Sequence, residues 1–203
     1  PATRDLASIV MLDSARIQQY EKGGAYYEEK DCIETMNHFR CSVYGKEKKL
    51  NDNFKFTFYD AGHILGSSML DISIPKYTNF FSKLIHKKSE NRMHILFSGD
   101  LGRKNNPICK PPETDIPAPD YIYLESTYGA KTHESIDTVY QELAYVINRT
   151  IERGGKVIIP SFAVERAQEL IYFIKVLMKQ EKVPRVPVYI DSPMASNATG
   201  VFN

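Results

Sequence analysis

Three side chains that suit hydrolytic chemistry each follow a strand-like run of the sequence. His63 stands between Gly62 and Gly66 in the stretch FYDAGHILGSS, Asp100 follows MHILFSG, and Glu125 follows YIYL. An imidazole held on a tight turn suits a metal ligand or a general base, and a carboxylate has two oxygens with which it can bridge two cations. Each of these residues, taken alone, also fits a plain structural role in capping a turn.

The elements expected to position these residues are short strands. Alternating or apolar runs predict four strands of one sheet, at Phe54–Phe58, Met69–Ile74, His94–Phe97 and Tyr121–Leu124. Polar residues that follow strand ends face the edge where sites in α/β sheets form. We therefore expect His63, Asp100 and Glu125 on one rim of this sheet, and this coincidence favours a common site over three separate turn caps.

The pattern of expected helices and strands changes near residue 130. Helix-like patterns at 135–153 and 163–180 alternate with short apolar runs at 156–160 and 186–191, which predict two further strands. Helices and strands that alternate with short loops are typical of a parallel α/β sheet. The sequence therefore predicts an α/β protein in two parts, and two further helical patterns, at 5–20 and 31–39, open the chain.

Composition excludes some classes of protein. The chain has 203 residues, 42% of them hydrophobic and 25% charged, with a net charge of +1, so bulk charge does not indicate a nucleic-acid partner. No apolar run reaches the about 20 residues needed to cross a bilayer, so no membrane partner is expected. The three cysteines form no CxxC pair, which argues against a thiolate zinc site and favours reduced thiols in the cytoplasm.

Five ordered motifs carry a specific resemblance. DAGHILGS, LFSGDLGR, YLESTYG, GGKVIIPSFAVERAQELIY and PVYIDSPMA resemble the metallo-β-lactamase-fold nucleases of the β-CASP family over nearly the whole chain. That family includes the endonuclease subunit of the pre-mRNA 3′-end cleavage complex and many prokaryotic RNases, and this chain looks more like the bacterial members. The resemblance implies that residues 1–130 are the second part of a metallo-β-lactamase αββα sandwich and residues 131–203 the first part of a β-CASP α/β domain.

The resemblance also implies a role for each residue of the rim. His63 matches a ligand of one zinc ion, and Asp100 matches the catalytic carboxylate that bridges two zinc ions. Glu125 matches a catalytic acidic residue that supports a leaving-group histidine, so Glu125→Gln should slow the reaction without loss of metal. The implied reaction is two-metal hydrolysis of RNA phosphodiesters. Arg166, at the start of a helix, is a candidate for binding a substrate phosphate; a helix-surface ion pair with a nearby glutamate is the alternative.

One family motif, His-x-His-x-Asp-His, is absent from the sequence. We expect the chain to be a fragment of a metal-dependent ribonuclease that binds zinc weakly and is inactive alone. The alternatives are a non-catalytic scaffold paralogue in an RNA-processing complex and a small-molecule hydrolase such as a thioesterase, although FAVERAQELIY argues against the latter. Endonuclease or exonuclease action, single-stranded DNA as a second substrate and homo-oligomerisation all stay open.

Overall fold

The computed structural model describes residues 1–20, 24–76, 92–132 and 135–202, and the statements below concern these residues. Contacts divide the chain into two compact units. The first unit comprises Arg40–Thr127 together with Pro1, and the second comprises Ala2–Phe39 and Tyr128–Asn203. Each unit is described by itself, and the assignment of residues 1–130 and 131–203 to two family domains stays a prediction.

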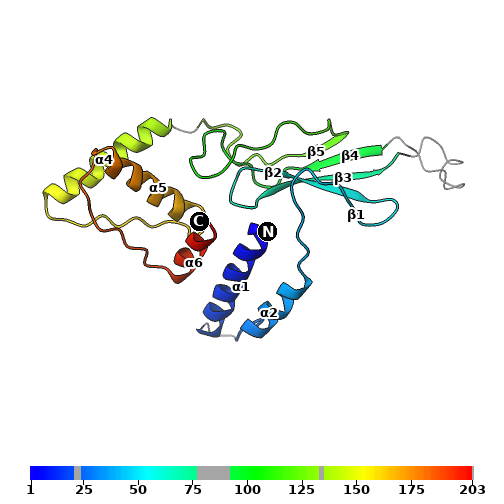
Figure 1. The fold of residues 1–203 in the computed structure, drawn as a ribbon, viewed down its shortest axis with the longest axis horizontal. Helices are drawn as coiled ribbons and strands as arrows, with labels where there is room; N and C mark the ends of the chain where they lie inside the picture. Colours follow the sequence, from blue (N-terminus) through cyan, green and yellow to red (C-terminus); the bar gives the residue numbers. More distant parts are fainter. Residues whose placement is uncertain (21–23, 77–91, 133–134, 203) are drawn as a thin grey trace, which may run out of the picture. The chain divides into compact units, whose positions relative to one another are not determined.

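The first unit contains a five-stranded sheet, seen edge-on in Figure 1. Neighbouring strands follow one another in chain order: β1 (Lys48–Lys49), β2 (Lys55–Asp60), β3 (Ser68–Pro75), β4 (Arg92–Phe97) and β5 (Tyr121–Tyr123). The first four strands pair antiparallel, and β5 pairs parallel with β4. The four strands predicted from the sequence are confirmed, with ends that differ by at most two residues.

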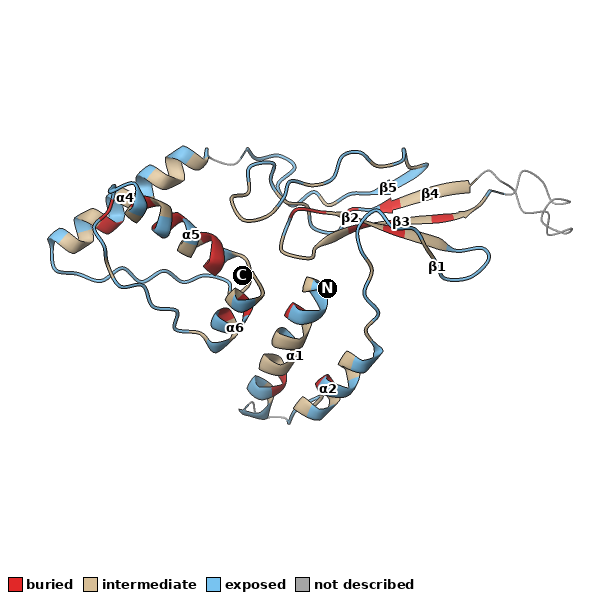
Figure 2. Ribbon diagram, viewed as in Figure 1, coloured by how far each residue is buried: buried red, intermediate tan, exposed pale blue. Residues whose placement is uncertain are grey.

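The buried face of the sheet mixes apolar and polar side chains. Along β3, the buried positions Met69, Asp71 and Ser73 alternate with half-buried ones (Figure 2). The Asp71 carboxylate lies 2.9 Å from Nδ1 of His94 on β4, so this buried acid has a partner. The apolar cluster of this face has three buried residues and three partly buried ones, namely Ala61, Met69, Leu96, Tyr59, Leu101 and Ile116.

The second unit is built from helices: α1 (Ala2–Tyr20), α2 (Glu29–His38), α4 (Ile136–Glu152), α5 (Arg166–Lys179) and α6 (Pro193–Val201). The helix α1 packs against both α2 and α6. Arg16 of α1 donates two hydrogen bonds to the carboxylate of Glu29 in α2, which makes a bidentate ion pair. The buried core of the unit lies between α4, α5 and the turn after α5, where Leu177 is fully buried beside Ile147, Ile174 and Val183. With a sheet in one unit and helices in the other, the predicted α/β class is confirmed.

Two predictions for the second unit are wrong. The segments 156–160 and 186–191 are not strands, although their apolar composition predicts them. A strand is stabilised by backbone hydrogen bonds to a neighbouring strand, and no such neighbour lies among the described residues. As a result, Ile158 is 89% exposed and Tyr189 is 86% exposed.

The start of α5 has an unusual backbone. Glu165, the N-cap residue, has φ +69° and ψ −60°. The N–H of Arg166 donates to the carbonyl oxygen of Val164 at 2.9 Å, which closes a γ-turn around Glu165. This tight turn sets Arg166 as the first residue of α5.

Among the described helices, none is both long and apolar enough to span a bilayer.

Candidate active site at the rim of the sheet

Strand direction brings the three predicted residues to one edge of the sheet. Both β2 and β4 run antiparallel to β3, so they run in the same direction, and β5 runs parallel to β4. The carboxyl ends of β2, β4 and β5 therefore meet at a common rim. His63 lies three residues beyond β2, Asp100 three beyond β4, and Glu125 two beyond β5. The structure thus brings all three together, as the sequence predicts.

Hydrogen bonds from backbone N–H groups to two side chains fix the turn that carries His63. Gly62 has φ +62°, in the left-handed region that glycine adopts without strain, and its N–H donates to the Asp60 carboxylate at 2.8 Å. The Ser67 hydroxyl accepts from the N–H of His63 at 3.0 Å and from that of Ile64 at 3.2 Å. The turn is held by its own polar groups, and the His63 side chain remains 44% exposed.

Two glycines allow the turns of His63 and Asp100 to touch. The N–H of Gly102 donates to the carbonyl oxygen of Ala61 at 2.8 Å. A Cβ atom at Gly102 would collide with the carbonyl group of Gly62 and lie 2.6 Å from the His63 nitrogen. A side chain at position 102 would therefore force the two turns apart, and with them the two candidate ligands.

The Asp100 carboxylate is 76% exposed, and its Oδ2 lies 3.9 Å from Nε2 of His63. Bonds from zinc to nitrogen or oxygen are about 2.0–2.2 Å, so two ligand atoms of a tetrahedral zinc ion lie about 3.4 Å apart. The donor chemistry of this pair fits a shared zinc ion, and its separation is wider than the tetrahedral value by about half an ångström. Among the described residues, no group of three or more His, Cys, Asp or Glu side chains is arranged to hold a metal. The pair supplies two ligands, whereas catalytic zinc sites normally have three from the protein.

Glu125 makes more contacts than the sequence suggests. Its Oε1 accepts the N–H of Leu101 at 2.9 Å, and its Oε2 accepts the N–H of Thr127 at 3.2 Å. The Leu101 N–H is the largest cause of a lowered pKa for Glu125, followed by Thr127, with a smaller contribution from the charge of His63. The carboxylate is therefore held ionised at neutral pH.

Ser98 is a part of the rim that the sequence reasoning missed. Its side chain is nearly fully buried, and its hydroxyl donates to the Gly99 carbonyl at 2.7 Å and accepts the N–H of Glu125 at 3.0 Å. Ser67 was missed in the same way. A hydroxyl two residues before Asp100, or four after His63, was the available signal, but small polar residues near turns are too common to single out.

Arg166 belongs to the second unit. Its guanidinium pairs with the carboxylate of Glu169, whose side chain is only 4% exposed. The ion pair with a nearby glutamate, named as the alternative, is therefore present, although Glu169 is buried rather than on the helix surface. Half of the Arg166 side chain remains exposed, at 52%, and a guanidinium has five N–H donors, so a phosphate contact stays a prediction.

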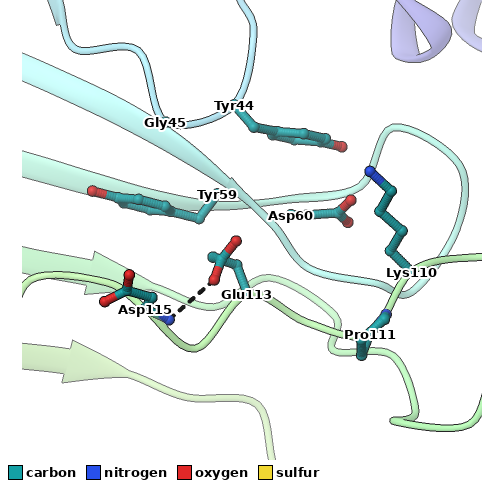
Figure 3. Close-up of a pocket in the computed structure, with 8 residues that line it drawn as sticks. All are labelled: Tyr44, Gly45, Tyr59, Asp60, Lys110, Pro111, Glu113 and Asp115. Atoms are coloured by element: carbon teal, nitrogen blue, oxygen red, sulfur yellow. Dashed lines mark hydrogen bonds between the residues drawn. The ribbon is translucent and has the colours of Figure 1, made fainter.

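A cavity of about 320 Å³ lies in the first unit beside the end of β2 (Figure 3). It is lined by Tyr44, Gly45, Tyr59, Asp60, Lys110, Pro111, Glu113 and Asp115. Burial, together with the charge of Asp60, raises the pKa of Tyr44 to about 12. The Tyr44 hydroxyl therefore stays protonated and donates to the carbonyl oxygen of Ser67 at 2.7 Å. This bond supports the turn that carries His63.

Comparison with known proteins finds relatives whose similarity extends over nearly the whole chain. Residues 167–203 match the Beta-Casp domain. The chain is 33% identical over 202 residues to the RNase J-like protein of Methanocaldococcus jannaschii, a match that covers 98% of this chain and 42% of that protein. It is 30% identical over 201 residues to ribonuclease TTHA0252 of Thermus thermophilus, with 99% and 41% covered.

A third relative is the transcription termination factor FttA of Thermococcus kodakarensis. It is 30% identical over 204 residues, which are 99% of this chain and 29% of that protein. The chain thus spans less than half the length of these relatives. Because the similarity runs through the whole chain in all three cases, the resemblance carried by the five motifs is confirmed.

Proposed function

We propose that this chain, a relative of the metallo-β-lactamase-fold β-CASP nucleases, belongs to an enzyme that hydrolyses RNA phosphodiesters with zinc. The observation that carries the proposal is the convergence of His63, Asp100 and Glu125 on one rim, with His63 and Asp100 3.9 Å apart. Relatives named ribonucleases support RNA as the substrate. Cytoplasmic location, single-stranded DNA as a second substrate and homo-oligomerisation remain predictions of the sequence.

Each residue of the rim has its own role in this proposal. His63 would hold zinc through its neutral imidazole nitrogen, and Asp100 would hold it through a carboxylate whose negative charge offsets that of the cation. Zinc bound there would supply Lewis-acid stabilisation of the negative charge that builds up on the phosphate. The Ser67 hydroxyl and the Gly62–Gly102 contact fix the backbone that carries the imidazole, so this turn is already formed before the reaction.

RNA cleavage by the whole protein, meaning the longer protein of which this chain is expected to be a fragment, tests the proposal. An end-labelled single-stranded RNA is incubated with the protein as purified, after removal of metal by a chelator, and after zinc is added back. We expect cleavage that disappears with chelation and returns with zinc. Mononucleotide products would indicate an exonuclease and a ladder of fragments an endonuclease.

The same assay addresses the alternatives. RNA that binds without being cleaved under any metal condition would contradict hydrolysis and support the scaffold paralogue. Cleavage that is unaffected by chelation would contradict the role of zinc while leaving the nuclease intact. A thioester that is hydrolysed while RNA is untouched would favour the small-molecule hydrolase.

A further inference from the structure

The turn that carries Asp100 is tied to the sheet on both sides of that residue. Before Asp100, the Ser98 hydroxyl donates to the Gly99 carbonyl and accepts the N–H of Glu125. After Asp100, the N–H of Leu101 donates to the Glu125 carboxylate at 2.9 Å. Glu125 therefore contributes its backbone to one tie and its side chain to the other.

The turn needs such ties because its own conformation is weakly constrained. Gly99 has φ +55°, and glycine loses more conformational freedom on folding than any other residue. The Asp100 side chain is 76% exposed, so packing does not hold it in place. The ties on either side of Asp100 therefore set where its Cβ atom lies, and with it the positions that the carboxylate can reach.

We propose that Glu125 is a positioning residue that fastens the Asp100 turn to the end of β5 by accepting the N–H of Leu101, while the N–H of Thr127 holds its other carboxylate oxygen. This role differs from support of a leaving-group histidine, because it acts on the candidate metal ligand. A carboxylate can accept two N–H groups with its two oxygens, whereas an amide offers one oxygen and an NH₂ group that cannot accept. The consequence for zinc rests on the proposed function, but the tie itself does not.

Amide hydrogen exchange of Leu101, measured by NMR in metal-free protein, tests the tie directly. In Glu125→Ala, the Leu101 N–H loses its acceptor, and we expect its exchange to be at least about 10-fold faster, the scale of losing a hydrogen bond to a charged group. Glu125→Gln is close in shape to the parent and keeps one acceptor oxygen. Its Leu101 exchange rate should therefore lie between those of the parent and of Glu125→Ala. It also keeps the test decisive if the alanine variant folds poorly.

Glu113 offers a matched control. Its Oε1 also accepts two backbone N–H groups, those of Thr114 at 3.1 Å and Asp115 at 3.0 Å, but both belong to its own loop. Glu113→Ala should therefore leave exchange at Leu101 unchanged. An equal rise at Leu101 in the control and in Glu125→Ala would mean that exchange reports general loosening, and would overturn the proposal.

Zinc affinity and kinetics of the same variants give the second readout. We expect Glu125→Gln and Glu125→Ala to weaken zinc binding, measured by competition with a chelating dye, by up to about 10-fold, because the Asp100 carboxylate becomes less well placed. A lower kcat with unchanged zinc affinity and unchanged Leu101 exchange would overturn the proposal and favour the histidine-support role. If the whole protein does not cleave RNA, the proposed function fails, while Leu101 exchange still decides the tie.

Discussion

The four strands of the first unit and the two apolar segments of the second unit have similar sequences and different structures. Both sets are short runs rich in β-branched or aromatic residues. The first set forms β2 to β5, whereas 156–160 and 186–191 pair with no strand among the described residues. The difference lies in the neighbours. Each of β2 to β5 has a hydrogen-bonded neighbour, and the turn at His63 returns the chain directly from β2 to β3.

The comparison shows that composition predicts which segments favour an extended backbone, while pairing decides which become strands. It also separates two sources of stability. The first unit rests on a hydrogen-bonded sheet with a small apolar cluster under its rim. The second unit rests on contacts between helices around Leu177. Substitutions in each region test this contrast.

The largest effect is expected in the helical core. Leu177→Ala removes a fully buried side chain and leaves a cavity, so we expect a loss of about 2–5 kcal/mol in the free energy of unfolding. Ile158→Ala, in an apolar segment without a strand partner, is the control and should cost less than about 0.5 kcal/mol. Urea denaturation of the whole protein measures both. Equal losses for the two variants would show that 156–160 is packed as a strand and would remove the contrast.

The next largest effect is expected at the rim. Asp100→Asn keeps the shape of the side chain and removes the charge that balances a cation, so RNA hydrolysis should fall by at least about 100-fold. Asp115→Asn, an exposed acid of the same unit, should leave the rate unchanged. The cleavage rate is measured beside the metal content of each variant. Cleavage by Asp100→Asn at the parent rate would show that the assembled rim is not the active site.

A smaller effect is expected at Arg166 in the second unit. If its exposed guanidinium meets a phosphate, Arg166→Ala should raise the KM for RNA about 10-fold and weaken the dependence of binding on salt. Glu169→Gln removes the ion pair without removing the guanidinium, and serves as the control that should leave KM near its parent value. An unchanged KM in Arg166→Ala, with a lower unfolding temperature, would limit Arg166 to pairing with the buried Glu169.

The smallest effect concerns pH and the edge of the sheet. The N–H of His94, followed by the side chain of Lys76, lowers the pKa of Asp120 below its ordinary value of 3.8. Its contribution to stability is therefore fully present above about pH 4 and is lost as the pH falls through the lowered value. In denaturation curves, Asp120→Ala should be less stable than the parent at pH 7, and this difference should shrink as the pH falls through the lowered value. An equal loss of stability at both ends of this pH range would contradict the role of the ionised Asp120 carboxylate.

Much of the rim could be predicted from the sequence because its residues follow strands directly. A glycine-framed histidine and two carboxylates at strand ends are visible as patterns, and the direction of successive strands places them on one edge. The ties made by Ser67 and Ser98 could not be predicted, because their partners are backbone groups that only the folded turns bring within reach. The failed strands show the same limit, since no local pattern states whether a pairing neighbour exists.

The γ-turn at Glu165 has a consequence for protein engineering. A residue with a side chain in this γ-turn conformation costs about 1–3 kcal/mol, whereas glycine has no Cβ atom to strain. Glycine gains more freedom in the unfolded chain, so the net benefit of replacing Glu165 would be on the order of 1 kcal/mol. Position 165 is therefore a place where glycine, normally a poor choice beside a helix, would raise the melting temperature of the protein.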